Sequence, residues 1–381
     1  EIKRIEEPTE LIFIDLGKGK RRLGGSVLSQ ILQNIYGETP DVECEEEMTH
    51  FVEIMFSLLN EKKVLAYHDR SDGGLITTLL EMAFCSRLGL DISCELKEES
   101  LLEYFFNEEL GVVVQIKSKD LNYFRSKFEK TGIDLKFNTI AKLRDDNRIV
   151  IKSGDNVVHK TNIRELLKEW NRVSNEIQLL RDNPKTASQE QVSDEDIDRP
   201  GIMPKLYFDV PSDFKVKTRP QVAILREQGI NGHNEMAAAF SEVGFSCQDL
   251  HMTDIINKKA YLNQFEGVVA CGGFSYGDVL GAGRGWANTI LYNDVLRTQF
   301  EDFFSNTEKF TLGICNGCQM LANLKEIIPG ADEWPKFDMN SSERFEARLV
   351  QVKISSSDSV FFKGMKDSII PIPVAHGEGK L

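Results

Sequence analysis

The second half of the chain alternates short apolar runs with amphipathic stretches. The apolar runs predict strands at residues 221–225, 245–250, 267–271 and 310–312, and helical periodicity predicts helices at residues 232–243 and 286–304. Strands that alternate with helices in this way build a parallel sheet. The run at residues 267–271 is almost wholly apolar, as expected for a strand covered on both faces. The pattern therefore predicts an α/β domain over residues 219–381.

The first half of the chain mixes helical stretches with β-rich runs. Those runs predict strands at residues 11–15, 64–67, 111–116 and 148–151. We interpret residues 1–162 as an α+β domain. A helix of mixed charge is predicted at residues 163–181, before an acidic stretch with Pro and Gly that continues through Pro211. Such a composition is typical of a linker, so we expect a helical and acidic connector over residues 163–218.

Composition and charge narrow the classes of function. The chain has 381 residues, enough for two or three domains that each bury a core. Its net charge of −14 and its pI near 5.1 leave no basic face for a phosphate backbone, so nucleic acid is not an expected partner. No apolar run approaches the roughly 20 residues of a membrane span, so no membrane partner is expected.

The cysteines and the chain ends add two expectations. Seven cysteines, an odd number, are scattered through the chain, which indicates reduced thiols and a cytoplasmic protein. The chain begins with Glu1 rather than Met, and it ends at Leu381 directly after a strand-like run. We therefore expect a piece of a longer protein.

The segment Gly313-Ile314-Cys315-Asn316-Gly317 predicts a strand, a sharp turn and a helix with a cysteine at the apex. Glycines two residues before and after the cysteine remove the Cβ clashes of such a strained turn. The start of the following helix directs N–H groups at the sulfur and favours thiolate over thiol. A thiolate in this position suits attack on a carbonyl carbon and formation of a covalent thioester.

Two other interpretations of Cys315 remain open at this point. With Cys318 it forms a Cys-x-x-Cys sequence, and redox pairs also open helices after strands. No second Cys-x-x-Cys is present to complete a zinc site. A buried cysteine that only packs in the core is also common.

Attack by a thiolate on an amide also requires donors for the developing oxyanion and a base. The N–H of Asn316 and a glycine of the loop at residues 272–278 are candidate donors, although that loop is also consistent with an ordinary strand-to-helix turn. His376 and Glu378 are two residues apart after an apolar run, so on a strand they would share a face as a base and its carboxylate.

The first domain has its own candidate site at residues 68–75, which contain Asp69, Ser71 and Asp72 and open a helix at Leu75. N–H groups at a helix start suit phosphate, and the two carboxylates fit there if Mg²⁺ bridges them to phosphate oxygens. Alternatively, Asp72 is a helix cap and the glycines form a plain turn. A second glycine-rich loop, residues 17–26, could also bind phosphate, although such a loop is more often simply exposed to solvent.

These motifs together resemble the carboxyl-terminal part of the large, single-chain phosphoribosylformylglycinamidine synthases of purine biosynthesis. The resemblance extends over nearly the whole chain. It rests on motifs at residues 14–20, 23–26, 68–75, 106–111, 181–184, 272–278, 313–318 and 376–379.

The resemblance implies both fold and activity. Residues 1–162 would be similar to the C-terminal domain of aminoimidazole ribonucleotide synthetase, and residues 219–381 to a class I glutamine amidotransferase with a flavodoxin-like parallel sheet, truncated at its C-terminus. The family hydrolyses glutamine and passes ammonia internally to its synthetase part. There ATP activates the amide oxygen of formylglycinamide ribonucleotide, and ammonia replaces it. The products are formylglycinamidine ribonucleotide, ADP, phosphate and glutamate.

The same resemblance assigns roles in the amidotransferase domain. Cys315 is implied to be the nucleophile, Asn316 and Gly273 to serve the oxyanion, and Gln319 to help hold glutamine. Arg284 departs from the family pattern, where we expect Glu.

In the synthetase domain, Asp69 is implied to be a Mg²⁺ ligand and Ser71 a nucleotide contact. Both would belong to an auxiliary site for ATP or ADP, and the N-terminal synthetase domains of the same chain would be partners.

The family also revises the expectation for the base. Its catalytic His and Glu lie in a Pro-His-Pro-Glu motif nearer the C-terminus, which these residues do not reach. His376 and Glu378 are then structural neighbours of the site rather than members of the triad. The chain alone would be inactive, as a module that binds glutamine or nucleotide without turnover.

Overall fold

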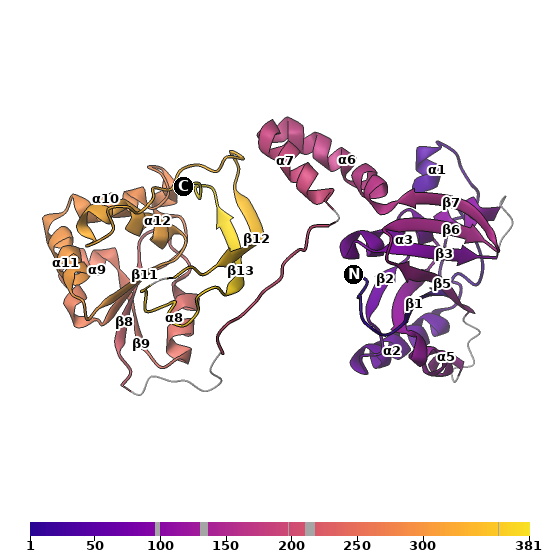
Figure 1. Cartoon of the computed structure of the whole chain (residues 1–381), viewed down its shortest axis with the longest axis horizontal. Coiled ribbons are helices and arrows are strands. Elements are labelled where there is room, and N and C mark those ends of the chain that lie inside the picture. The colour runs from indigo at the N-terminus through magenta and orange to yellow at the C-terminus, as the bar shows by residue number, and fades with distance from the viewer. Residues whose placement is uncertain (96–99, 130–135, 197, 210–217, 357) are drawn as a thin grey trace. The chain divides into compact units, whose positions relative to one another are not determined.

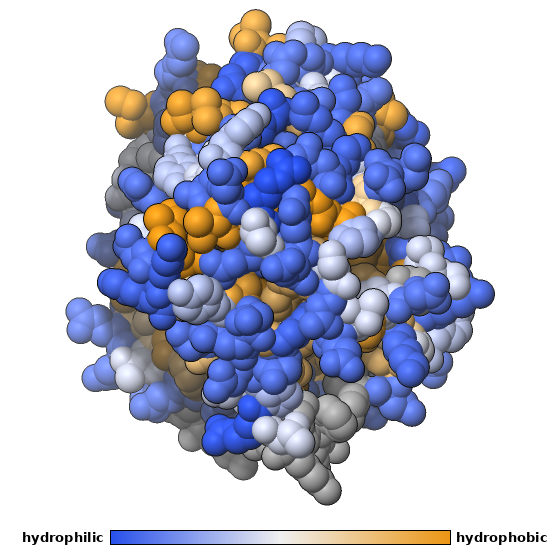
Figure 2. Space-filling view, turned by 90° about the vertical axis from the view of Figure 1, so that its left-hand side faces the viewer, coloured by the Kyte–Doolittle hydropathy of each residue, from blue (hydrophilic) through white to orange (hydrophobic). Residues whose placement is uncertain are grey.

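The computed structural model describes residues 1–95, 100–129, 136–196, 198–209, 218–356 and 358–381. It contains two compact units, one of residues 1–177 with 191–198 and one of residues 178–190 with 199–381. Within the described ranges, no helix combines the length and the apolar character that a membrane crossing requires. The face drawn in Figure 2 is mainly hydrophilic, with apolar residues in small groups.

The first unit is built on a mixed, seven-stranded sheet with the order β2-β4-β1-β5-β3-β6-β7 (Figure 1). Its strands are β1 (Thr9–Asp15), β2 (Ala66–Asp69), β3 (Gly89–Cys94), β4 (Gly111–Lys117), β5 (Lys136–Arg144), β6 (Arg148–Ser153) and β7 (Asn156–Asn162). Neighbouring strands pair antiparallel except β3 and β6, which run parallel. The α+β class expected for this part of the chain is confirmed.

Helices cover both faces of this sheet at β1, the third of its seven strands. They are α2 (Glu45–Asn60), α3 (Gly74–Ser86), α4 (Leu101–Phe106) and α5 (Leu121–Glu129), and the unit also contains the short helix α1 (Val27–Ile31). Phe13 of β1 lies in a core with residues of α3 and α4, whereas Ile12 lies in a second core with residues of α2 and α5. Successive side chains of a strand point to opposite faces, so a strand covered on both faces is apolar at every position.

Helices α6 (Ile163–Arg181) and α7 (Pro184–Asp194) follow this sheet in the chain. The first confirms the predicted helix, and the second lies in the acidic stretch of the predicted connector, where no second helix was expected. The Oδ1 of Asn183 accepts hydrogen bonds from the N–H groups of the next turn at 3.1 and 3.4 Å. Asn before a helix and Pro at its first position begin a helix as readily as they form a turn. Parts of the predicted connector, residues 197 and 210–217, lie outside the described residues.

The second unit is built on a four-stranded parallel sheet with the order β11-β10-β8-β9. Its strands are β8 (Gln221–Arg226), β9 (Ser246–His251), β10 (Gly267–Ala270) and β11 (Phe310–Gly313). All four residues of β10 are buried, as predicted for a strand covered on both faces. The expected flavodoxin-like parallel sheet is therefore confirmed.

The helices of this unit are α8 (His233–Glu242), α9 (Met252–Ile256), α10 (Arg284–Leu291), α11 (Asp294–Ser305) and α12 (Asn316–Asn323). The single helix predicted at residues 286–304 is wrong, because Asn293 starts a new helix there. Its Oδ1 accepts a hydrogen bond from the N–H of Leu296 at 3.1 Å. Strands β12 (Glu346–Lys353) and β13 (Ile369–His376) form a separate antiparallel hairpin.

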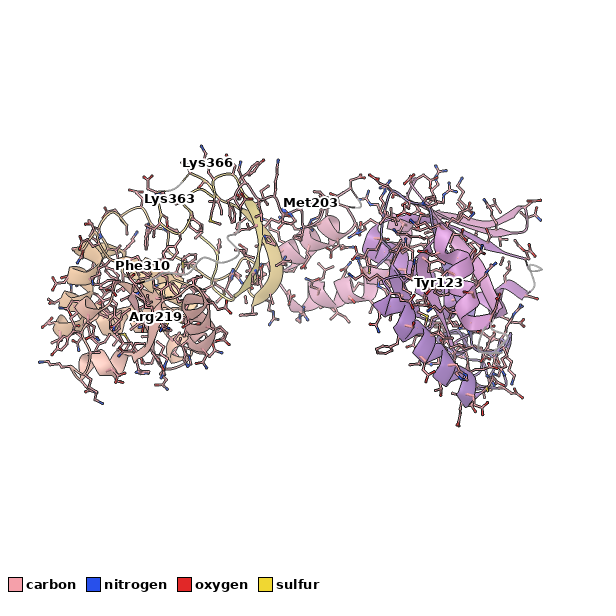
Figure 3. The ribbon with its side chains drawn as sticks, turned by 90° about the horizontal axis from the view of Figure 1, so that it is seen from below. Tyr123, Met203, Arg219, Phe310, Lys363 and Lys366 are labelled. Atoms are coloured by element: carbon pink, nitrogen blue, oxygen red, sulfur yellow. The ribbon has the colours of Figure 1, made fainter. Side chains whose placement is uncertain are left out.

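Aromatic side chains close the end of the sheet where β11 begins. The ring of Phe310, labelled in Figure 3, stacks on Phe240 at 6.3 Å and meets Phe361 edge-on at 5.7 Å. A Cβ at Gly267 of β10 would lie 2.2 Å from the Phe310 ring. The aromatic cluster thus fixes the beginning of β11, and the carboxyl end of this strand carries the site described next.

Candidate active site

Cys315 lies at the turn between β11 and α12, as the sequence predicted. It is the N-cap residue of α12, with φ 53° and ψ −115°, and its side chain is exposed. A positive φ at a residue with a Cβ is strained, and such strain concentrates at functional sites. The turn therefore holds the sulfur in the open at the start of a helix.

The two glycines of this turn serve the packing of α12. A Cβ at Gly317 would lie 2.1 Å from the carbonyl oxygen of Ala270 in β10, and one at Gly313 would lie 2.7 Å from Leu321 Cδ1. Neither glycine has a positive φ. The strained backbone conformation is thus taken by Cys315 itself, while the glycines let the helix approach the sheet.

A glycine-rich loop at residues 272–278 lies against the cysteine. A Cβ at Gly272 would be 3.1 Å from the Cβ of Cys315 and 3.7 Å from its Sγ. Gly273 has φ 149°, and a Cβ there would lie 2.6 Å from the carbonyl oxygen of Gly229. Gly273 requires glycine because main chain lies where a side chain would be, whereas a side chain at Gly272 would press on that of Cys315.

Backbone hydrogen bonds around this loop leave two N–H groups free beside the thiol. At the bridge between Ile230 and Gly273, the N–H of Phe274 donates to the carbonyl of Gly229 at 2.9 Å. The carbonyl of Gly272 accepts from the N–H of Asn231 at 3.3 Å. Among the described residues, the N–H groups of Gly273 and Asn316 donate to no protein acceptor. Two unpaired donors next to a thiolate suit a developing oxyanion.

The side chain of Asn316 has a structural role that the sequence did not reveal. It is 1% exposed, and its Oδ1 accepts hydrogen bonds from the Oγ of Ser275 at 2.6 Å and its N–H at 3.3 Å. Its Nδ2 donates to Asp278 Oδ1 at 2.9 Å and to Gln319 Oε1 at 3.4 Å. This buried amide fastens the glycine-rich loop to the start of α12.

A cavity of about 500 Å³ opens over the cysteine. It is lined by Asn231, Gly232, Gly272, Gly273, Phe274, Asp278, Ala282, Cys315, Gln319, Phe345, Ala375, His376, Gly377 and Glu378. Burial raises the pKa of Asp278, and the nearby Glu378 carboxylate raises it further, against hydrogen bonds from Asn316 and Gly283. Two carboxylates and no Lys or Arg are among these described lining residues, so the cavity suits a ligand with a cationic group.

Gln319 connects two walls of the cavity. Its side chain is on α12, and its Nε2 donates to the carbonyl oxygen of Glu378 at 2.5 Å. Its Oε1 accepts from the Asn316 amide. The residue expected to hold glutamine therefore lies in the cavity, with its polar atoms tied to both walls.

The structure does not bring His376 and Glu378 together as a base and its carboxylate. His376 Nδ1 lies 3.0 Å from Asn340 Oδ1, and Glu378 Oε2 accepts from the N–H of Ala282 at 3.0 Å. Strand β13 ends at His376, so the alternation that would place both residues on one face stops there. The only hydrogen bond of the Cys315 sulfur among the described residues is to the carbonyl of Ala375, at 3.9 Å.

The redox alternative for Cys315 and Cys318 gains little from the structure. No disulfide joins any two cysteines of the described residues. Burial raises the pKa of the Cys318 thiol, and the neighbouring Cys315 adds to this effect. Because thiolate is the reactive form in disulfide exchange, the buried Cys318 is not the attacking thiol of such a pair.

In the first unit, Asp69 and Ser71 lie where β2 leads into α3, and both are exposed. Asp69 Oδ1 accepts a hydrogen bond from the hydroxyl of Tyr67 at 2.6 Å, which leaves one carboxylate oxygen for another ligand. Among the described residues, no group of three or more His, Cys, Asp or Glu side chains is arranged to hold a metal ion. The donor set fits Mg²⁺ only where phosphate oxygens complete the coordination.

The start of α3 differs from the expectation in two respects. The helix begins at Gly74 rather than Leu75, and its N-cap is Gly73 with φ 80°, so Asp72 is not the helix cap. The N–H of Gly73 donates to Glu108 Oε1 at 2.9 Å, and that of Gly74 donates to Ser71 at 2.9 Å. These two N–H groups, which suited phosphate in the sequence, already have protein acceptors.

Carboxylates also engage the cations of the loop at residues 17–26. Lys18 pairs with Glu47 at 2.9 Å, Lys20 with Glu43 at 2.7 Å and Arg22 with Glu109 at 2.6 Å. Only the family resemblance marked residues 106–111 in the sequence. Their contacts with this loop are long-range and leave no local signal.

Comparison with known protein families assigns a domain to each half of the chain. Residues 219–381 match the CobB/CobQ-like glutamine amidotransferase domain, and residues 12–154 match the C-terminal domain of AIR synthase related proteins. The chain joins an AIR synthase-related domain to a glutamine amidotransferase domain. This pair, in this order, confirms the resemblance to the phosphoribosylformylglycinamidine synthases.

Solved structures from Thermotoga maritima are also similar to parts of the chain. One is described as the structure of PurLQS, with 24% identity over 42% of this chain and 68% of that chain and a TM-score of 0.35. PurL complexed with FGAR has 15% identity over 43% of this chain and 28% of that chain, with a TM-score of 0.36. PurL complexed with ATP has 14% identity over 43% and 26%, with a TM-score of 0.34. The chain thus covers about a quarter of these PurL chains, and likeness of this degree supports no functional assignment.

Proposed function

We propose that residues 219–381 form the glutaminase part of a phosphoribosylformylglycinamidine synthase and that Cys315 is its nucleophile. The observation that carries this proposal is the strained, exposed Cys315 at the start of α12, with the free N–H groups of Gly273 and Asn316 beside it. The match of this region to a glutamine amidotransferase domain supports it.

The proposed reaction begins with attack of the Cys315 thiolate on the side-chain carboxamide of glutamine. A C–S bond forms, and the carbonyl oxygen becomes an oxyanion that accepts hydrogen bonds from the N–H groups of Asn316 and Gly273. The C–N bond then breaks, the nitrogen leaves as ammonia after protonation, and a glutamyl thioester remains. Water hydrolyses this thioester to glutamate and restores the thiol.

The cavity supports an amino acid as substrate. Glutamine carries an α-ammonium group, and the carboxylates of Asp278 and Glu378 are acceptors for such a group. Gln319, which joins the two walls of the cavity, is proposed to contact the substrate as well. An uncharged amide without the ammonium would lack this recognition.

We propose that the catalytic base comes from outside residues 1–381. Among the described residues, no imidazole or carboxylate forms a hydrogen bond with the sulfur of Cys315. The chain alone is then expected to bind glutamine without turning it over.

For the first unit we propose part of the nucleotide-binding machinery of the synthetase. Asp69 would supply a carboxylate oxygen to Mg²⁺, and Ser71 would contact ATP or ADP, since both side chains are exposed after β2. Bound Mg²⁺ would neutralise phosphate charge there. The complete reaction would use ATP and formylglycinamide ribonucleotide and would require the N-terminal synthetase domains.

Protection of Cys315 from alkylation tests the glutaminase proposal. The intact chain is treated with iodoacetamide, and the modified cysteines are mapped by mass spectrometry with and without glutamine. Glutamine is expected to slow the modification of Cys315, whereas N-acetylglutamine, which lacks the ammonium charge, is expected to protect less. Equal modification of Cys315 at all glutamine concentrations would contradict the proposal.

A further inference from the structure

A buried asparagine on the loop before β12 makes more hydrogen bonds to the cavity wall than any role assigned so far explains. Asn340 is 5% exposed. Its Nδ2 donates to the carbonyl oxygens of His376 at 2.7 Å and Arg344 at 2.9 Å. Its Oδ1 accepts from the N–H of Gly379 at 3.0 Å and lies 3.0 Å from His376 Nδ1. Every hydrogen-bonding site of this amide is thus engaged.

These contacts fix the orientation of the amide. Carbonyl oxygens only accept hydrogen bonds, so the NH₂ group must face His376 and Arg344. The amide oxygen then faces the imidazole, and an oxygen without a hydrogen can only accept. His376 must therefore carry its proton on Nδ1. In the neutral ring this leaves Nε2 as an acceptor, on a residue that lines the cavity.

The same asparagine holds the turn at residues 377–379. Its backbone N–H donates to the carbonyl of Gly377 at 2.9 Å. A Cβ at Gly379 would lie 1.9 Å from His376 Cε1, so the imidazole rests directly on this glycine. Within this turn, the carbonyl of Glu378 accepts a hydrogen bond from Gln319 on α12. Loss of the amide would release the cavity wall that faces the cysteine.

We infer that Asn340 is the positioning residue of the substrate cavity: it fixes the wall at residues 376–379 and holds His376 as the tautomer with an acceptor at Nε2. As far as the substrate is glutamine, this inference rests on the proposed function. The tautomer itself does not depend on that function.

Nitrogen NMR of the intact chain tests the tautomer directly. With ¹⁵N-labelled histidine, the signals of His376 are assigned by their loss in His376→Gln. For the neutral ring we expect a protonated Nδ1 and an unprotonated Nε2, and a mixture of tautomers in Asn340→Ala. A protonated Nε2 in the unsubstituted chain would overturn the inference whatever the substrate is.

Labelling kinetics test the positioning role. The variant Asn340→Asp keeps the acceptor for His376 Nδ1 but cannot donate to the carbonyls of His376 and Arg344. We expect it to slow modification of Cys315 by a diazoketone analogue of glutamine by about tenfold to a hundredfold, as small displacements of a positioned group do. Modification by iodoacetamide, which needs no positioned substrate, should change by less than about twofold.

Asn293→Asp is the matched control, because Asp replaces Asn equally well as the cap of α11. Equal effects of Asn340→Asp on both reagents, or no effect on either, would contradict the positioning role. Failure of the diazoketone to modify the unsubstituted chain would instead contradict the proposed function and leave the NMR result as the measure of the tautomer.

Discussion

At the scale of single residues, the turn after β11 places the strained backbone conformation on one residue and the close helix-to-sheet approach on another. Cys315 takes the positive φ, and Gly317 provides the room for α12 next to β10. The sequence marked both residues, because a cysteine between two glycines is a local pattern. Asn340 left no such mark, since its partners His376 and Gly379 are more than 30 residues away in the chain.

Replacement of Gly317 by alanine tests whether the close approach of α12 to β10 requires this glycine. The added Cβ would lie 2.1 Å from the carbonyl oxygen of Ala270, so α12 must move away from the sheet. We expect the free energy of unfolding to fall by about 1–3 kcal/mol, as for other overpacked sites, and the reaction of Cys315 with the glutamine analogue to slow. Urea unfolding measures the first effect. Gly377→Ala is the control for stability, because a Cβ there would meet nothing within 4 Å, and an equal loss in both variants would refute the steric explanation.

Burial also predicts a ranking of the cysteines by reactivity. It raises the pKa of Cys271 to about 12, and it raises the pKa of Cys318 as well. In the folded chain Cys271 is therefore a thiol below about pH 12, and at pH 8 only roughly one molecule in ten thousand carries the thiolate at this residue. Iodoacetamide at pH 8 should modify Cys315 and spare Cys271 until the chain is unfolded. Modification of Cys271 in the folded chain at the rate of Cys315 would show that the ranking is wrong.

At the scale of elements, the sequence predicted those whose pattern is complete within the segment. The strands β8, β10 and β11 and the helix α6 follow from apolar runs and helical periodicity. Strand β7 was missed because most of its residues are exposed, so no apolar run marks it. The break between α10 and α11 was missed because one capping residue, rather than periodicity, decides it.

The cap of α11 gives a prediction at this scale. Asn293→Ala removes the acceptor for the N–H of Leu296 and should lower the free energy of unfolding by about 1 kcal/mol. Asn293→Asp keeps an acceptor and should change stability by much less. Thermal or urea unfolding of the three proteins distinguishes them, and equal stability of all three would mean that the cap does not start this helix.

At the scale of the whole molecule, the order of domains was predictable, but the chemistry of each was predictable only in part. The match of residues 12–154 and 219–381 to two different domain families agrees with the resemblance found in the sequence. The acidic character of the cavity was not predictable, because Asp278 and Glu378 are 100 residues apart and meet only through the fold.

The proposal that the catalytic base lies outside residues 1–381 predicts that the chain alone does not hydrolyse glutamine. Since no base among the described residues forms a hydrogen bond with Cys315, residues 1–381 should release no glutamate from glutamine above the rate of Cys315→Ser. A coupled glutamate assay at saturating glutamine measures this. Turnover that depends on Cys315 would show that the base is within this chain and would direct attention to His376.

If Cys315 is the nucleophile of a site that binds glutamine, a glutamine-mimicking diazoketone should form a covalent adduct with it, and mapping that adduct is the most direct measurement. We expect one adduct, on Cys315, which free glutamine suppresses and Cys315→Ser abolishes, while Cys318→Ser retains it. An adduct on another cysteine, or an adduct on Cys315 that glutamine does not suppress, would contradict the proposed role of Cys315.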